Sequence, residues 1–142
     1  MSAERKPDSA RYWLDQAHRR LRDAPQRGPD RDRRVQCEQA HYAAEFAVKG
    51  VVIAHGADFD TTHDIGALLD TARAVGEGIP HEVDESAALS TYAGSGRYDF
   101  DTDPEHADVS EEELQEALEQ SRRVVEWADG RITTMLQGLP PP

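Results

Sequence analysis

The chain has 142 residues, which suits one domain with one sizeable core. Its formal net charge of −12 excludes general, patch-driven binding of nucleic acid over the whole surface. The charge is uneven, however, because residues 1–34 carry a net +4 and residues 35–142 a net −16. The basic N-terminal part therefore leaves room for a local anion site, although solubility alone is a sufficient reason for the acidity.

One cysteine, Cys37, excludes an intrachain disulfide and fits a reducing compartment, so we expect a cytoplasmic protein. The N-terminus is charged and lacks the apolar core of a signal peptide, and no run is long and apolar enough to cross a membrane. The six histidines show no zinc-ligand spacing with the cysteine. We therefore expect no membrane contact, metal or cofactor.

The first predicted helix follows a loose tail, residues 1–8, with Ser9 as its N-cap and Pro25 closing it. Its buried stripe comprises Trp13, Ala17, Leu21 and Ala24. Tyr12 and Trp13 are adjacent on this helix, so both cannot face the same core. One of the two is therefore expected to lie on a surface that a partner covers.

The central predicted helix runs from Arg34 to Gly56, with Gly56 as its C′ residue. Small and branched apolar residues recur at three- and four-residue steps: Ala40, Ala43, Ala44, Ala47, Val51 and Ala54. The second half is apolar almost all round, which is typical of a buried helix. The polar residues of its first half are expected to face water: Glu38, Gln39 and Glu45. The alanines should let neighbouring helices approach closely.

Three further segments have helical patterns. His63 and Asp64 open a helix whose apolar face begins at Ile65, and a shorter helix spans about 84–92 with Ala88, Leu89 and Tyr92 inward. A long acidic loop, 94–109, follows, and Ser110 with Glu113 forms a capping box for the last helix. The predicted fold is all-α, an up-and-down antiparallel bundle of four to five helices over residues 9–136, with a disordered tail at 137–142.

Several short motifs occur in a fixed order along the chain. They are A-R-Y-W-L-x-x-A (10–17), C-E-Q-A (37–40), A-E-x-x-x-K (44–49), H-D-I (63–65), I-P (79–80) and R-Y-D (97–99), and the last helix ends near Trp127. In this order they resemble the HEPN family (higher eukaryotes and prokaryotes nucleotide-binding) over residues 9–130. The resemblance implies a helical bundle that commonly forms a homodimer.

The same resemblance implies a function. Many members are metal-independent ribonucleases that act as toxins or are encoded beside a small nucleotidyltransferase, and others bind nucleotides. The nuclease members carry an arginine followed four to six residues later by a histidine. Here eight residues separate Arg97 from His106. These two residues are the catalytic candidates, but the altered spacing makes nucleotide or RNA binding the first expectation.

Arg97 is the strongest candidate for a ligand contact, because a guanidinium binds phosphate in a bidentate way. Tyr98 could stack on a base or hydrogen-bond a phosphate. A structural role is equally consistent with the sequence, since Arg97 could pair with Asp99 or Asp101 in the same loop. His106 could serve as a general acid or base, or simply be solvated.

His63 and Lys49 complete the predicted ligand-binding set. His63 precedes a helix start, where backbone N–H groups favour anions, but it could instead cap the helix or face the core. Lys49 lies on a largely apolar helix, where its ammonium must reach water or a partner.

Two other functions remain open. The run from His63 to Gly66 reads like the signature of HD-type metal phosphohydrolases, with His41 and a later aspartate completing a metal site. The third alternative is a structural helical interaction module without a small ligand. A thermal-shift screen with nucleotides and divalent metals separates these functions, since a ligand that binds the folded state raises its apparent stability.

Overall fold

The computed structural model describes residues 7–29, 31–93 and 109–138. They form α1 (Pro7–Asp23), α2 (Arg33–Ala54), α3 (Ile65–Ala74), α4 (His81–Asp84), the 3₁₀ helix η2 (Glu85–Tyr92) and α7 (Glu111–Leu136). The only β pairing in these residues is an isolated bridge between Gly28 and Arg31. The predicted all-α bundle is confirmed.

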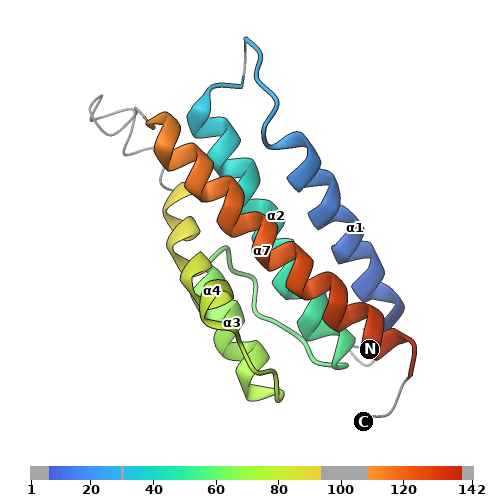
Figure 1. Cartoon of the computed structure of the whole chain (residues 1–142). Helices are drawn as coiled ribbons and strands as arrows, with labels where there is room; N and C mark the ends of the chain where they lie inside the picture. Colours follow the sequence, from blue (N-terminus) through green and yellow to red (C-terminus); the bar gives the residue numbers. More distant parts are fainter. Residues whose placement is uncertain (1–6, 30, 94–108, 139–142) are drawn as a thin grey trace.

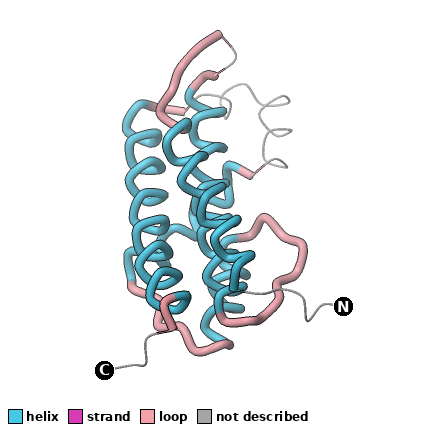
Figure 2. The backbone as a smooth tube through the Cα atoms, turned by 90° about the vertical axis from the view of Figure 1, so that its right-hand side faces the viewer, coloured by secondary structure: helices cyan, strands magenta, loops and turns pink. Residues whose placement is uncertain are grey.

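The three long helices α1, α2 and α7 lie side by side, and the shorter α3, α4 and η2 flank them on one side (Figure 1). In the perpendicular view the helices run along a common direction, joined by loops at the ends (Figure 2). α1 runs opposite to α2, and α4 with η2 runs back toward the start of α7. Because α2 contacts α1, α7, α3 and η2, it is the central helix that the sequence predicted.

Close packing around α2 follows from its small residues. Ala40, Ala43, Ala44 and Ala47 are completely buried, as are Val51 and Ile53. At Gly50 an added Cβ would lie 3.3 Å from both the Ala10 carbonyl oxygen and Trp13 Cβ of α1. The backbones of α1 and α2 thus approach to a distance that only a glycine at position 50 permits without a shift.

Local capping signals set both ends of α2. The Asp32 side chain accepts a hydrogen bond from Val35 N at 2.9 Å, which satisfies a free N–H of the first turn. Gly56 adopts a positive φ of 78°. Its N–H donates to the Ile53 oxygen at 2.8 Å, and the next amide, that of Ala57, donates to the Val52 oxygen at 3.3 Å. This is a Schellman ending, so Gly56 is the C′ residue that was predicted.

The start of α7 also agrees with the sequence. Glu113 N donates to Ser110 Oγ at 3.0 Å and Ser110 N donates to Glu113 Oε1 at 2.9 Å, which completes the predicted capping box. Further along, the buried Ser121 hydroxyl donates to the Ala40 oxygen of α2 at 2.7 Å. That bond fixes α7 against α2 where the small alanine side chains bring the helices close.

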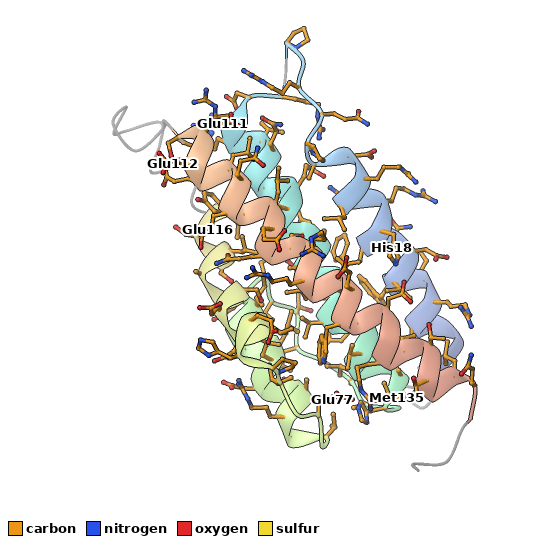
Figure 3. All side chains as sticks on the ribbon, viewed as in Figure 1. His18, Glu77, Glu111, Glu112, Glu116 and Met135 are labelled. Atoms are coloured by element: carbon orange, nitrogen blue, oxygen red, sulfur yellow. The ribbon has the colours of Figure 1, made fainter. Side chains whose placement is uncertain are left out.

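A group of ion pairs joins the C-terminal ends of α2, α3 and α7. The nearly buried Glu77, just after α3, accepts from His55 Nε2 at 2.7 Å and from Arg131 Nη2 of α7 at 3.0 Å. Burial alone would raise the pKa of Glu77, but the hydrogen bonds from Arg131 and His55 outweigh it and hold the pKa below its usual value. Figure 3 shows Glu77 at the end of the bundle where Met135 of α7 also lies.

Four local predictions were wrong. α1 already includes Pro7, so Ser9 is inside the helix and not its N-cap; proline is well tolerated in a first helical turn. Ala88 of η2 is not buried, because the 3₁₀ geometry differs from the α-helical period used to place it. Glu38 and Glu45 do not face water: Glu38 is 5% exposed and Glu45 is 0% exposed.

Within the described ranges, no helix is long and apolar enough to cross a membrane.

Candidate functional site around Glu45

A fully buried carboxylate, that of Glu45, lies at the middle of α2 and has three side-chain partners. Lys49 Nζ lies 2.7 Å from its Oε2. His41 Nε2 and His63 Nδ1 each lie 3.1 Å from its Oε1. A buried carboxylate is stable only where charge and hydrogen bonds compensate for its lost hydration, and here both are supplied. We call these four residues the Glu45 cluster.

Helical spacing and one connector bring the cluster together. His41 and Lys49 stand one turn before and one turn after Glu45 on the same side of α2. His63 arrives from the connector to α3, 18 residues later. The connector is fixed beside it, because Asp64 N donates to Thr62 Oγ1 at 3.0 Å and the Asp64 carboxylate caps α3 through Ala67 N at 3.3 Å.

Aromatic rings surround the ammonium group of Lys49. Its Nζ lies 5.4 Å from the ring centre of Trp13, 5.8 Å from that of Phe46 and 5.1 Å from that of Phe59. Such contacts add cation–π attraction to the ion pair with Glu45. With Lys49 only 7% exposed, its charge is satisfied inside the protein and does not reach bulk water.

His41 is the neutral member of the cluster. Burial, followed by the positive charges of His63 and Lys49, lowers the pKa of His41 to about 4. Because the carboxylate of Glu45 accepts, the proton of the neutral ring lies on Nε2. Its Nδ1 is then a buried acceptor, and it has no partner among the described residues.

His63 connects the cluster to the surface. Its side chain is 60% exposed, yet Nδ1 stays within 3.1 and 3.3 Å of the two Glu45 oxygens. The ring also meets Tyr42 edge to face, with centres 5.8 Å apart. The hydrogen bond to Glu45 uses Nδ1, which leaves Nε2 on the opposite edge of the ring free for a further contact.

Arg20 of α1 also contacts the Tyr42 ring. Its guanidinium carbon lies 5.5 Å from the ring centre, and its Nη1 donates to Gln39 Oε1 at 2.8 Å. A cation from α1 and a histidine from the connector thus flank one aromatic side chain of α2. We call this surface of Arg20, Tyr42 and His63 the His63 face.

Comparison with known proteins identifies the fold family. The sequence matches the family profile of the HEPN domain over residues 10–131. The chain belongs to the HEPN family. Among solved structures, TT1696 from Thermus thermophilus superposes with a TM-score of 0.69 at 27% identity, covering 86% of this chain and 97% of that one. The structure of ST0689, an archaeal HEPN homologue, superposes with a TM-score of 0.68 at 22% identity, covering 87% and 97%. No curated protein matches.

The HEPN match includes every member of the Glu45 cluster and lies inside the predicted domain of residues 9–136. The family resemblance drawn from the motifs is confirmed. The match also favours the HEPN interpretation over the HD-type one. The Asp64 carboxylate of the HD-type motif caps α3 through Ala67 N at 3.3 Å.

The predicted site residues of this HEPN chain fall into two groups. Arg97, Tyr98 and His106 lie outside the described residues, so their roles stay predictions. His63 and Lys49 are brought together, since both contact Glu45. Sequence reasoning missed Glu45 itself. The signal that could have found it is the spacing of His41, Glu45 and Lys49, one turn apart on an otherwise apolar helix.

Three surface hollows among the described residues lie away from the Glu45 cluster. One, of about 300 Å³, opens between η2 and the first turns of α7. Its lining comprises Ala88, Leu89, Thr91, Tyr92, Glu113, Glu116, Ala117 and Gln120. The acidic lining disfavours an anionic ligand there. The chemistry of the Glu45 cluster therefore places the candidate site at the His63 face, not in this hollow.

Proposed function

We propose that this HEPN protein binds a phosphate-bearing ligand, a nucleotide or RNA, at the His63 face. The observation that carries the proposal is that His63 is exposed to solvent while a buried carboxylate holds one of its ring nitrogens. A side chain already fixed in one orientation loses little entropy on binding. Arg20 beside the same Tyr42 ring adds a guanidinium suited to a phosphate oxygen.

Charge supports the same placement. Arg20 belongs to the basic part of the chain, residues 1–34, whereas the remainder is strongly acidic. The carboxylates of Glu111, Glu112 and Glu116 gather over the first half of α7 (Figure 3). An anionic ligand is repelled from that end of α7 and favoured near α1. Arg97 and Tyr98 remain in the proposal as further ligand contacts.

Binding to a fluorescent single-stranded RNA and to nucleotides tests the proposal by anisotropy and calorimetry. We expect His63→Ala and Arg97→Ala each to weaken binding by about 1–3 kcal/mol, the scale of a lost charge-assisted hydrogen bond. His81→Ala is the matched control, since His81 lies on α4 and its side chain is 87% exposed. Arg97→Ala and His81→Ala should keep the melting temperature nearly unchanged, whereas His63→Ala should lower it, because it removes one of the three hydrogen-bond partners of the buried Glu45. Equal affinity of His63→Ala and wild type would refute the site.

The thermal-shift screen separates the remaining functions. A rise in melting temperature with nucleotides supports ligand binding, and a rise with divalent metals alone would favour metal chemistry. If neither raises it and no RNA binds, the helical interaction module becomes the better description. Lys49→Ala is unsuitable as a binding test, because Lys49 is buried against Glu45.

We further propose a homodimer and a small nucleotidyltransferase as protein partner, in the setting of a toxin–antitoxin pair. The exposed side chain of Tyr12, 59% accessible beside the half-buried Trp13, supports a covered surface on α1. Light scattering at high micromolar concentration tests the dimer, and a monomeric mass would contradict it. Tyr12→Ser should weaken the dimer without lowering the melting temperature of the monomer.

A further inference from the structure

The acidic hollow between η2 and the first turns of α7 has the chemistry of a cation site. We propose that it binds a small organic amine, an aliphatic mono- or polyamine with a protonated nitrogen and a methylene body. The hollow measures about 300 Å³, at the small end of the range of ligand pockets. The proposal goes beyond the anion site at the His63 face and does not depend on it.

The walls of the hollow come from two segments that are far apart in the sequence. η2 and the start of α7 lie side by side (Figure 1). Leu89 and Ala117 are buried apolar members of the lining, and the half-buried Tyr92 adds an aromatic ring. Such a lining removes a methylene chain from water, and the face of an aromatic ring attracts a cation. The hollow therefore suits a ligand that is both apolar and positively charged.

Two carboxylates, those of Glu113 and Glu116, supply the charge of the lining. The two residues are three positions apart on α7, so their side chains are neighbours on one face of the helix. Figure 3 shows Glu116 on the side of α7 toward η2. Glu113 accepts from Ser110 N through Oε1, and Glu116 Oε2 lies 3.4 Å from Gln120 Nε2. The other oxygen of each carboxylate has no partner in the described part of the chain.

These two carboxylates also differ in their pairing from other glutamates of α7. Glu111 lies 3.4 Å from Arg33, and both Glu119 and Glu126 contact Arg122. Neither carboxylate of the hollow has a cationic partner among the described residues, whose contribution to the lining includes no lysine or arginine. A protonated amine therefore complements the charge of this lining.

Tyr92 and Cys37, which share a hydrogen bond, respond to the same carboxylates. Burial is the main cause that raises the pKa of Tyr92 to about 12, and the electrostatic effects of Cys37, Glu113 and Glu116 raise it further. Burial is also the main cause of the raised pKa of Cys37, to which the charge of Glu113 contributes. The negative field of the carboxylates thus reaches the aromatic side of the hollow, where a bound cation would be stabilised.

Calorimetric titration and ¹H–¹⁵N NMR test the site at constant ionic strength with butane-1,4-diamine, n-butylamine and the uncharged n-butanol. We expect both amines to bind and to shift the amide signals of η2 and of α7 around Glu113 and Glu116. Glu113→Gln and Glu116→Gln should each weaken diamine binding about threefold to tenfold, between the effects of an exposed and an enclosed ion pair. Glutamine preserves the side-chain size, and at position 113 it keeps an oxygen that can accept from Ser110 N.

Glu112→Gln is the matched control, since it removes one charge from the same end of α7 at a residue outside the lining. It should bind the diamine as wild type does. Equal weakening by all three glutamine substitutions, or NMR shifts spread over the acidic surface, would show a counterion atmosphere only and overturn the site.

Two further outcomes would also overturn the assignment. Binding of n-butanol as tight as that of n-butylamine would show that the charge of the ligand has no role. The probe α-N-acetyllysine amide carries the same ammonium group on a peptide unit. Tighter binding of this probe than of n-butylamine would exclude a free amine as the ligand and assign the hollow to a lysine side chain of a partner protein.

Discussion

Gly50 of α2 lies so close to Ile132 of α7 that a Cβ atom at Gly50 would come within 2.9 Å of Ile132 Cδ1. The Ala10 oxygen of α1 would lie 3.3 Å away on another side. One position on the central helix thus sets the spacing of all three long helices. The absence of a side chain, normally unfavourable in a helix interior, is explained by this contact.

Substitution of Gly50 by alanine should destabilise the protein. Alanine favours the helix by about 1 kcal/mol, but the backbone oxygen of Ala10 cannot yield as a flexible side chain can, so overpacking of about 1–3 kcal/mol prevails. Gly130 of α7 is the matched control, because a Cβ atom added there would meet nothing within 4 Å. Gly130→Ala should stabilise by about 0.5–1 kcal/mol. Urea unfolding measures both, and shifts of the same sign would contradict the argument.

Removal of one partner of the Glu45–Lys49 pair should be more harmful than removal of both. Glu45→Leu leaves the Lys49 ammonium buried without its carboxylate, which should cost about 3–5 kcal/mol. Lys49→Met should cost less, since His41 and His63 still donate to Glu45. The double variant should recover part of the loss, with a coupling energy of about 0.5–3 kcal/mol in a double-mutant cycle. Strictly additive effects would show that the pair is not coupled.

Stability should fall as the pH is lowered from 7 to 5. The pKa of His41 is lowered from 6.5 to about 4 in the folded protein. The unfolded chain therefore takes up a proton in this window while the folded protein does not, which favours unfolding by about 2 kcal/mol at pH 5. Well above the unfolded pKa of 6.5 both states are neutral at this site and the contribution is constant. His41→Gln should flatten the denaturation free energy between pH 7 and 5; an unchanged slope would assign the effect to other groups.

The thiol of Cys37 should be unreactive in the folded protein. Burial is the main cause that raises the pKa of Cys37 to about 11; a hydrogen bond with Tyr92 lowers it partly, and the charge of Glu113 raises it further. Reaction with a disulfide reagent at pH 8 should be at least about 100-fold slower than in urea, because the thiolate is scarce and enclosed. Cys37 is the single cysteine, so the signal is unambiguous. Complete reaction within the mixing time would contradict the burial.

The parts of the fold that depend on local sequence could be predicted. The apolar period located α2 and the stripe of α7, and neighbouring residues specify their ends, as with Gly56 and the Ser110–Glu113 capping box. The 3₁₀ form of η2 could not be predicted in this way, since the α-helical period assigned Ala88 to the interior. The local sequence of η2 has only a weak preference between α-helical and 3₁₀ geometry, so its packing against α3 and α7 determines the backbone conformation.

The candidate site shows a similar division. The helical spacing that brings His41 and Lys49 to Glu45 is local and readable. The path of the chain from Gly56 to His63 cannot be read from the sequence, because nothing in that polar connector specifies which face of α2 it crosses. Glu45 was assigned to water for this reason: a glutamate on a helix is normally exposed unless distant residues supply its partners.

The Glu45 cluster joins two parts of the bundle that are held with different strength. α1, α2 and α7 share the most extensive contacts, whereas α3 and η2 contact α2 less. His63 belongs to the connector before α3, but its partner Glu45 belongs to α2. Local opening of α3 and η2 would therefore separate His63 from Glu45 while leaving the Glu45–Lys49 pair intact. In a hydrogen-exchange experiment, the backbone amides of α3 should therefore exchange faster than those of α2. The fraction of molecules in which Glu45 orients His63 should equal the fraction in which α3 and η2 are closed.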